Sequence, residues 1–190
     1  EQKVMFVQQS DKRALLTDLL DDSTARRVLV FTRTKHRANR VARHLIQAGI
    51  SADAIHSNKS QGARQRALNQ FDRGQVRVLV ATDIMARGID VEDITHVINF
   101  EIPNEPEAYV HRIGRTARAG TAGVALSFCN SDELSLLASI EKLTRVSLTE
   151  EDHPFHASAI AAQRGSAAPG KSGARPAARA GATGGRGARG

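Results

Sequence analysis

Short apolar runs alternate along this chain with segments in which apolar residues recur every three or four positions. Runs such as RVLVF and RVLVA are typical of strands that are buried on both faces of a parallel sheet. They predict strands at residues 3–7, 27–32, 52–56, 76–82, 95–99 and 123–128. Because consecutive parallel strands need a crossover connection, usually a helix, the pattern predicts an α/β domain with helices on both faces of its sheet.

Helices are predicted in the segments between these strands. Four of them follow a residue that commonly caps a helix N-terminus, namely Ser10, Thr34, Ser60 and Ser131. The predicted helices cover residues 11–20, 35–48, 61–71, 105–113 and 132–143. In the second helix one stripe is apolar and is predicted to face the sheet; it consists of Ala38, Val41, Ala42, Leu45 and Ile46.

The length and composition of the chain indicate its cellular compartment and show that it has more residues than one ordinary domain needs. The 190 residues fit one ordinary domain plus an extension, and 41% are hydrophobic, which is enough for a buried core. No apolar stretch approaches the roughly 20 residues that cross a bilayer, and the polar start is unlike a secretory signal. Cys129 is the only cysteine, which excludes an intrachain disulfide. We expect a cytoplasmic protein without membrane partners, in which Cys129 is a small core residue.

The composition changes after Leu148 to Ala, Gly, Ser, Pro and Arg. We therefore predict a domain at residues 1–150 and a basic tail at 151–190, disordered from about residue 156 because it cannot bury enough apolar surface. Residues 156–190 contain six Lys or Arg and no acid, which leaves 21 basic and 20 acidic residues, a net charge of +1, for the rest. Such a cationic arm suits phosphate backbones.

Residues 165–172, GSAAPGKS, match the phosphate-loop pattern letter by letter. That loop functions because a buried strand precedes it and a helix N-terminus follows, so that backbone N–H groups point at the phosphates. Neither neighbour is predicted here. We interpret the match as a coincidence of composition and Lys171 as a plain phosphate contact.

Two strings carry the candidate chemistry. HRIGRTARAG, residues 111–120, places Arg112, Arg115 and Arg118 at three-residue spacing, so that their guanidinium groups can converge on one polyanion such as a triphosphate. ATDIMARGID, residues 81–90, follows a predicted buried strand, and open parallel sheets usually build their sites at that end of their strands. The alternatives are a solvated basic helix start for the first string and turn-capping aspartates for the second.

These strings resemble motifs VI and V of DEAD-box RNA helicases, and IHSNKSQGAR and FEIPNEPEAYVHRIGR are most similar to the bacterial RhlE-like branch. The resemblance runs from about Val4 to about Leu143 and covers only the second half of such an enzyme. It implies a RecA-like C-terminal helicase domain. The family's nucleotide-gripping loop, D-E-A-D string and S-A-T string belong to the preceding domain. ATP and Mg²⁺ would therefore be bound mainly by that absent N-terminal domain, and we expect the chain alone not to hydrolyse ATP.

The resemblance also assigns roles at the nucleotide. It implies that Arg115 and Arg118 reach the γ-phosphate, with Arg118 as the arginine finger. His111 and Arg112 would contact the first domain and stabilise the closed state. Gly88 and Asp90 would lie at the cofactor, with Asp90 on a ribose hydroxyl of RNA or nucleotide. No metal ligands are predicted in this chain.

An RNA surface is predicted beside the nucleotide residues. Strand-end residues and the Q-x-x-R element would contact the sugar-phosphate backbone; they are Thr32, Arg33, Gln61, Arg64, Thr82, Asp83 and Arg87. Arg87 would link the RNA and ATP sites. Trp is absent and Tyr109 is the only tyrosine, so we expect phosphate and 2′-hydroxyl contacts with little sequence preference.

Three functions remain open at this point. The first is an ATP-dependent RNA helicase whose partners are RNA, the N-terminal helicase domain of the same parent chain, and RNA-decay or ribosome-assembly factors. The second is a stand-alone RNA-binding or annealing module without ATPase activity. The third, ranked last, is a DNA helicase of the same superfamily.

Overall fold

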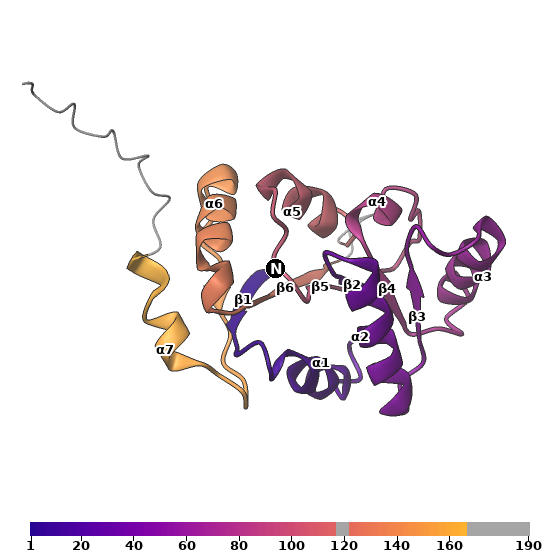
Figure 1. Cartoon of the computed structure of the whole chain (residues 1–190), viewed down its shortest axis with the longest axis horizontal. Helices are drawn as coiled ribbons and strands as arrows, with labels where there is room; N and C mark the ends of the chain where they lie inside the picture. The colour runs from indigo at the N-terminus through magenta and orange to yellow at the C-terminus, as the bar shows by residue number, and fades with distance from the viewer. Residues whose placement is uncertain (117–121, 167–190) are drawn as a thin grey trace, which may run out of the picture.

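A parallel sheet forms the centre of the molecule (Figure 1). The computed structural model describes residues 1–116 and 122–166. Within them the strands are β1 (Gln2–Phe6), β2 (Val28–Phe31), β3 (Ala52–Ile55), β4 (Val78–Ala81), β5 (His96–Asn99), β6 (Val124–Cys129) and β7 (Thr149–Glu150). Their order in the sheet is β3-β4-β2-β5-β6-β1-β7, and every neighbouring pair is parallel.

Helices cover both faces of the sheet (Figure 1). One face carries α1 (Lys12–Leu20) and α2 (Lys35–Gln47), and the other carries α3 (Gln61–Asp72), α4 (Asp83–Ala86), α5 (Pro106–Ile113) and α6 (Leu134–Thr144). The predicted α/β architecture and its six strands are confirmed. The two-residue β7 and the single-turn α4 were not predicted, because neither is long enough to show a hydrophobic period.

Alternate residues of the strands supply two layers of core. In β2, Val28 and Val30 pack beneath α1 and α2, whereas Leu29 and Phe31 pack beneath α3 and α4. Cys129 is fully buried beside α6 as predicted, and burial raises the pKa of its thiol to about 12.

The caps predicted from sequence are half right. Thr34 and Ser60 cap α2 and α3, since their hydroxyls accept hydrogen bonds from the backbone N–H groups of Arg37 and Ala63. Ser10 is wrong as a cap, because Asp11 holds the N-cap position of α1 and makes no side-chain bond there.

Two further details of the predicted helices need correction. Asn130, not Ser131, is the cap residue: it forms a capping box with Glu133 over the 3₁₀ turn Ser131–Glu133 that leads into α6. Ile46 was placed on the buried stripe of α2 but is 57% exposed. It lies at the edge of the stripe, since the neighbouring Leu45 is the residue of this turn that is fully buried in the core.

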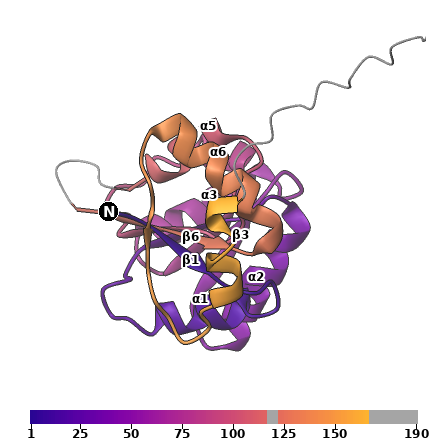
Figure 2. The same cartoon turned by 90° about the vertical axis from the view of Figure 1, so that its left-hand side faces the viewer.

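Ordered structure continues past the predicted boundary, so the expectation of disorder from about residue 156 is wrong up to residue 166 (Figure 2). The N–H of Ala157 donates to Phe6 O at 2.9 Å, and α7 (Ser158–Ala161) buries Ile160 against the α6 side of the core. Arg164 pairs with Glu141 and stacks over the Phe6 ring. One buried isoleucine and one paired arginine thus fix a segment whose average composition predicted disorder. Residues 167–190, with most of GSAAPGKS, lie outside the described residues.

Helix length excludes membrane crossing for the part of the chain that the structure describes: none of its helices is both long and apolar enough to span a bilayer.

Three histidines should make the fold acid-sensitive. Burial lowers the pKa of His56, His96 and His153 below the usual value. The unfolded chain therefore binds protons more readily. The contribution of these histidines to stability is complete above their unfolded pKa of about 6.5, and it is lost progressively as the pH falls from there through their lowered pKa values in the folded state. We expect the urea concentration at the unfolding midpoint to decrease as the pH is lowered from about 7.5 to about 5.5. Ordinary carboxylates titrate below this range of pH. His153→Gln should flatten this dependence; an equally steep dependence in that variant would remove His153 from the explanation.

Candidate functional site

Three neighbouring strands end at the same edge of the sheet and bring the two candidate strings together. Phe31 at the end of β2 pairs with Ala81 of β4 on one side and with Asn99 of β5 on the other. The residues that follow, Thr32 and Thr82, therefore start side by side at the carboxyl edge, where open parallel sheets place their sites.

Arg112 connects the two strings. Its side chain is 1% exposed, and Nε and Nη2 donate to the two carboxylate oxygens of Asp83 at 2.5 and 2.7 Å. Nη1 donates to Asn99 Oδ1 and to Glu101 O, and the guanidinium lies 5.0 Å from the centroid of the Phe31 ring. The aromatic face of Phe31 thus packs against the arginine string. All three guanidinium nitrogens of Arg112 are thus occupied inside its own domain, and the Asp83 carboxylate is its charged partner.

A groove lies between α4 and α5, which we call the α4–α5 groove. A hollow of about 40 Å³ and an adjoining shallow depression of about 500 Å³ make it up. Residues from both strings line it, namely Asp83, Arg87, His111, Arg112 and Arg115. Arg87 and His111 are exposed, and Arg115 is half-buried with Nη1 donating to Ile89 O at 3.0 Å. Arg118, the predicted finger, lies outside the described residues.

Gly88 and Asp90 follow α4 at the end of this groove, and both are exposed. A Cβ atom built on Gly88 would come no closer than 4.0 Å to any heavy atom, that of Met85 O, and its φ is not in the left-handed region. The fold of this domain therefore does not require glycine there.

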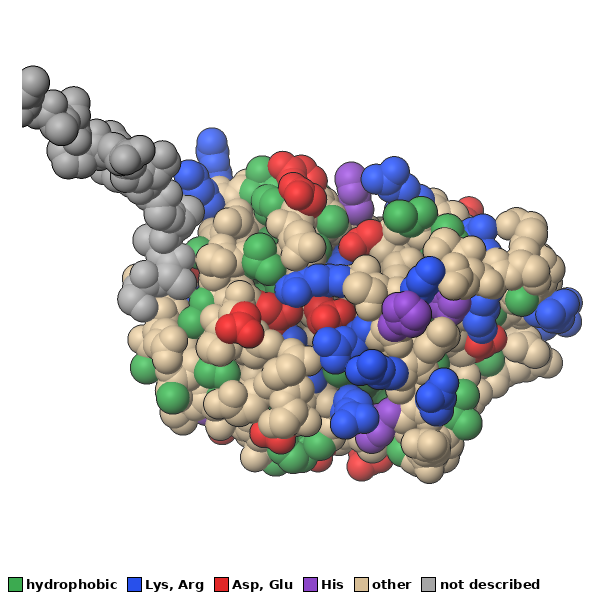
Figure 3. Space-filling view, in the orientation of Figure 1, with side chains coloured by type: hydrophobic (Ala, Val, Ile, Leu, Met, Phe, Trp, Pro, Cys, Tyr) green, Lys and Arg blue, Asp and Glu red, His purple; other side chains and the backbone are tan. Residues whose placement is uncertain are grey.

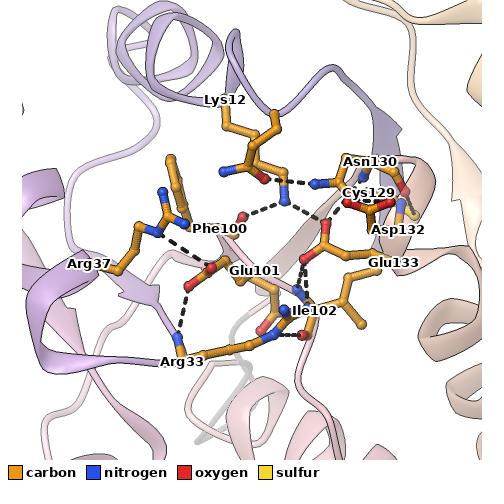
Figure 4. A network of polar contacts seen from close by, with 12 residues as sticks. Lys12, Arg33, Arg37, Phe100, Glu101, Ile102, Cys129, Asn130, Asp132 and Glu133 are labelled. Carbon is orange, nitrogen blue, oxygen red and sulfur yellow. Dashed lines mark hydrogen bonds and ion pairs between the residues drawn. The ribbon is translucent and has the colours of Figure 1, made fainter.

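Thr32 and Arg33, which follow β2, were both predicted to contact RNA, and the structure differs from this prediction at Thr32. Thr32 is fully buried and its hydroxyl donates to Thr34 O at 3.2 Å, so it supports the turn into α2 instead of offering oxygen to a ligand. Arg33 is partly exposed and firmly held: Nε donates to Ile102 O, Nη2 donates to Glu133 Oε1, and its backbone N–H donates to Glu101 (Figure 4).

Glu133 organises the surroundings of Arg33, and the sequence did not single it out. It accepts from Lys12 Nζ at 2.5 Å, from the Ile102 N–H at 3.0 Å and from the Asn130 N–H at 3.1 Å (Figure 4). Lys12 is 0% exposed, and burial lowers the pKa of its ammonium group while Glu133 opposes that shift. The N-x-x-E spacing of residues 130–133 was a usable signal for the capping box, but nothing in the sequence marks Lys12 as buried.

The Q-x-x-R element lies on the first turn of α3. Arg64 Nη1 donates to Gln61 Oε1 at 3.0 Å, whereas Arg64 Nε is buried without a hydrogen-bond partner in the described chain. The preceding loop is pinned by His56, whose Nε2 contacts Asn39 Oδ1 at 2.8 Å and whose Nδ1 accepts from the Asn58 N–H. Gln61 and Arg64 thus face the same carboxyl edge of the sheet as Arg33 and Thr82.

In residues 1–116 and 122–166 no three His, Cys, Asp or Glu side chains come together as ligands.

Residues 11–120 match the family described as helicase conserved C-terminal domain. A chain of the Escherichia coli DEAD-box protein SrmB, solved in complex with the regulator of ribonuclease activity A, superposes with a TM-score of 0.77 at 33% identity, covering 96% of this chain and 98% of that one. This chain is a helicase C-terminal domain of the DEAD-box family. The predicted RecA-like fold is confirmed by the same superposition.

Other relatives agree with this assignment. The DEAD-box ATP-dependent RNA helicase CshA of Bacillus subtilis is 42% identical over 164 residues, which are 86% of this chain and 33% of CshA. Saccharomyces cerevisiae Dbp5 bound to RNA and ADP BeF3 superposes at a TM-score of 0.73 with 30% identity, over 79% of this chain and 41% of that one. The DEAD-box chain thus spans about a third of the length of the curated relatives it matches. The RhlE-like branch stays a prediction.

The buried pair of Lys12 and Glu133 yields a stability test for this helicase domain. Removing one partner of a buried pair typically costs about 3–5 kcal/mol, because the other charge is left uncompensated. We expect Glu133→Gln to lower the free energy of unfolding by roughly that amount in urea titrations, and Glu92→Gln on the surface to change it by less than about 0.5 kcal/mol. Adding Lys12→Met to Glu133→Gln should recover part of the loss. Equal stability of Glu133→Gln and Glu92→Gln would contradict the role assigned to this pair.

Proposed function

We propose that this chain is the second helicase domain of an ATP-dependent RNA helicase, which binds the RNA sugar-phosphate backbone and supplies arginines to ATP hydrolysis during local duplex unwinding. The observation that carries the proposal is the bond between Arg112 and Asp83. It holds the two candidate strings at one edge of the sheet, so that cationic groups for a triphosphate and for RNA lie next to each other. The names of the relatives, and the Dbp5 structure with RNA and a nucleotide, support the same function.

Some residues of the α4–α5 groove would hold others in place, and the rest would contact the nucleotide. Arg112 neutralises Asp83, so that this carboxylate does not repel an approaching phosphate. Arg115 is held at the groove by Ile89 O, and Arg87 and His111 are exposed beside it. These groups suit the oxygen atoms of a triphosphate, and His111 also faces outward, where it can meet the preceding helicase domain. Mg²⁺ would neutralise phosphate charge, and we assign its ligands to that preceding domain because the described chain has no ligand cluster.

The RNA surface would run along the same edge, from Gln61 and Arg64 past Thr82 and Arg87 to Arg33, which follows the strand order β3-β4-β2. Arg33 is fixed in orientation by Glu133 and Ile102, which lowers the entropy lost when it binds a phosphate. Arg64 has a buried Nε without a partner, a donor that a phosphate oxygen could satisfy. Contacts of this kind read the backbone and carry no sequence information. We also propose factors of RNA decay or ribosome assembly as partners of the full-length protein.

The arginine finger is tested in the full-length parent protein, where we expect RNA-stimulated ATP hydrolysis. Removing an arginine finger costs about 10³–10⁵-fold in turnover. Arg118→Ala should lower turnover on that scale while RNA affinity is kept, and Arg73→Ala, which removes an exposed arginine at the end of α3, should leave turnover unchanged. Turnover that is insensitive to Arg118→Ala would reject the finger. A parent that binds RNA without hydrolysing ATP would favour the alternative, an RNA-binding or annealing module.

Gly88 separates function from folding. Because the domain has room for a Cβ atom at this position, Gly88→Ala should leave stability unchanged or raise it by up to about 1 kcal/mol. If a ligand or the other helicase domain approaches this backbone closely, the same substitution in the parent protein should lower RNA-stimulated turnover. Thermal unfolding and turnover measured on one preparation decide this. Unchanged turnover would show that Gly88 is not a point of close approach.

A further inference from the structure

A second concave site lies between α1 and α2, away from the α4–α5 groove and sharing no lining residue with it. We call it the α1–α2 pocket. Its volume is about 190 Å³, and its lining consists of Gln9, Ser10, Arg13, Arg37, Arg40, Val41 and Phe100. Three of these seven residues are arginines and none is acidic. In the space-filling view, Lys and Arg side chains gather over α2 and its border with α1 (Figure 3).

The packing of the two helices sets the arginines opposite one another. Thr17 Oγ1 and His44 Nε2 are hydrogen-bonded at 3.1 Å across the helix pair. Arg13 precedes Thr17 by four residues, and Arg40 precedes His44 by four, so each lies one turn earlier on the same face of its helix. Both helices begin at the carboxyl edge of the parallel sheet and therefore run in the same direction. The contact that joins Thr17 to His44 thus places Arg13 facing Arg40.

These arginines are electrostatically uncompensated. The side chains of Arg13 and Arg40 are exposed and form no hydrogen bond or ion pair with another described residue. The third arginine, Arg37, has its Nε 3.4 Å from Glu101 Oε1, but the other oxygen of that carboxylate already accepts from the Arg33 N–H (Figure 4). Helix α2 itself has no acidic residue. A concave site with this excess of positive charge favours an anion.

We propose that the α1–α2 pocket binds phosphate groups, and that these are phosphates of RNA continuing from Arg33. Planar guanidinium groups on two helices match the oxygen atoms of a phosphate, whereas they offer nothing to an apolar ligand. Glu101 contacts both Arg33 and Arg37, so the pocket adjoins the proposed RNA surface. Phosphate binding rests on the pocket alone, whereas its assignment to RNA rests on the proposed function.

The test compares variants of the 190-residue chain, so that the tail is the same in each. Arg13→Ala with Arg40→Ala should weaken binding of single-stranded RNA about tenfold and reduce the slope of log affinity against log salt by about 1.4, since each phosphate contact on a single strand contributes about 0.7. RNA of about 16 nucleotides should be affected more than RNA of about 6, which covers fewer subsites. Both arginines are exposed, so thermal unfolding should be unchanged.

The matched control removes two exposed arginines that do not line the pocket, Arg43 and Arg73. Arg43→Ala with Arg73→Ala changes the net charge equally, so a loss as large as that of the pocket variant would mean that only overall charge matters and would overturn the proposal. An unchanged RNA affinity in the pocket variant would reject RNA as the source of the phosphate.

Tripolyphosphate distinguishes the two sources. Suppose that the unsubstituted 190-residue chain binds tripolyphosphate saturably, and that the pocket variant loses this binding while its RNA affinity is unchanged. The pocket would then be a phosphate site for a small polyphosphate and not for RNA. If the chain binds no RNA but binds tripolyphosphate through Arg13 and Arg40, the proposed RNA function fails and the pocket stands. If neither tripolyphosphate nor RNA responds to the pocket variant beyond the control, the pocket is not a phosphate site.

Discussion

The buried guanidinium of Arg112 is the constraint on which the candidate site depends. Removing a charge from water costs several kcal/mol, and the chain meets that cost with a bidentate carboxylate, two neutral acceptors and an aromatic face. These partners come from α4, from β5 and the loop that follows it, and from β2. Every group that satisfies Arg112 is therefore held in place by it, including the four-residue helix α4, which could not persist alone.

Glu133 applies the same principle on the other side of the strand ends. It joins a buried lysine, two backbone N–H groups and the side chain of Arg33. Irregular loops lack the hydrogen-bond ladders of helices and strands, so a buried charge with several directed bonds can define their geometry instead. The loop after β5 lies between these two centres, since Glu101 O is bonded to Arg112 and the Ile102 N–H to Glu133.

How much of this the sequence reveals depends on how local the signal is. Continuous apolar runs identified six strands, because a parallel strand buried on both faces needs no partner to be recognised. The caps at Thr34 and Ser60 were equally local. Lys12 and Thr32 could not be placed, since a lysine or threonine is buried only by residues distant in sequence. The prediction of disorder at residues 156–166 was wrong for the same reason. The order of this segment depends on contacts of Ile160 and Arg164 with β1 and α6, which composition does not reveal.

Net charge is a poor guide to where this domain can bind a polyanion. The part of the chain before residue 156 carries only +1, yet its arginines differ in what they can still do. All three guanidinium nitrogens of Arg112 donate inside the domain, whereas Arg33 donates through Nε and Nη2, which fixes its orientation. The side chains of Arg13 and Arg40 donate to no described residue, and no acid lines their pocket. Because Coulomb attraction is screened over about 8 Å in physiological salt, recognition is decided by such local imbalance and not by the total. The fold produces that imbalance by pairing Asp83 with the buried Arg112 and Glu133 with Arg33, while Arg13 and Arg40 have no acidic partner among the described residues.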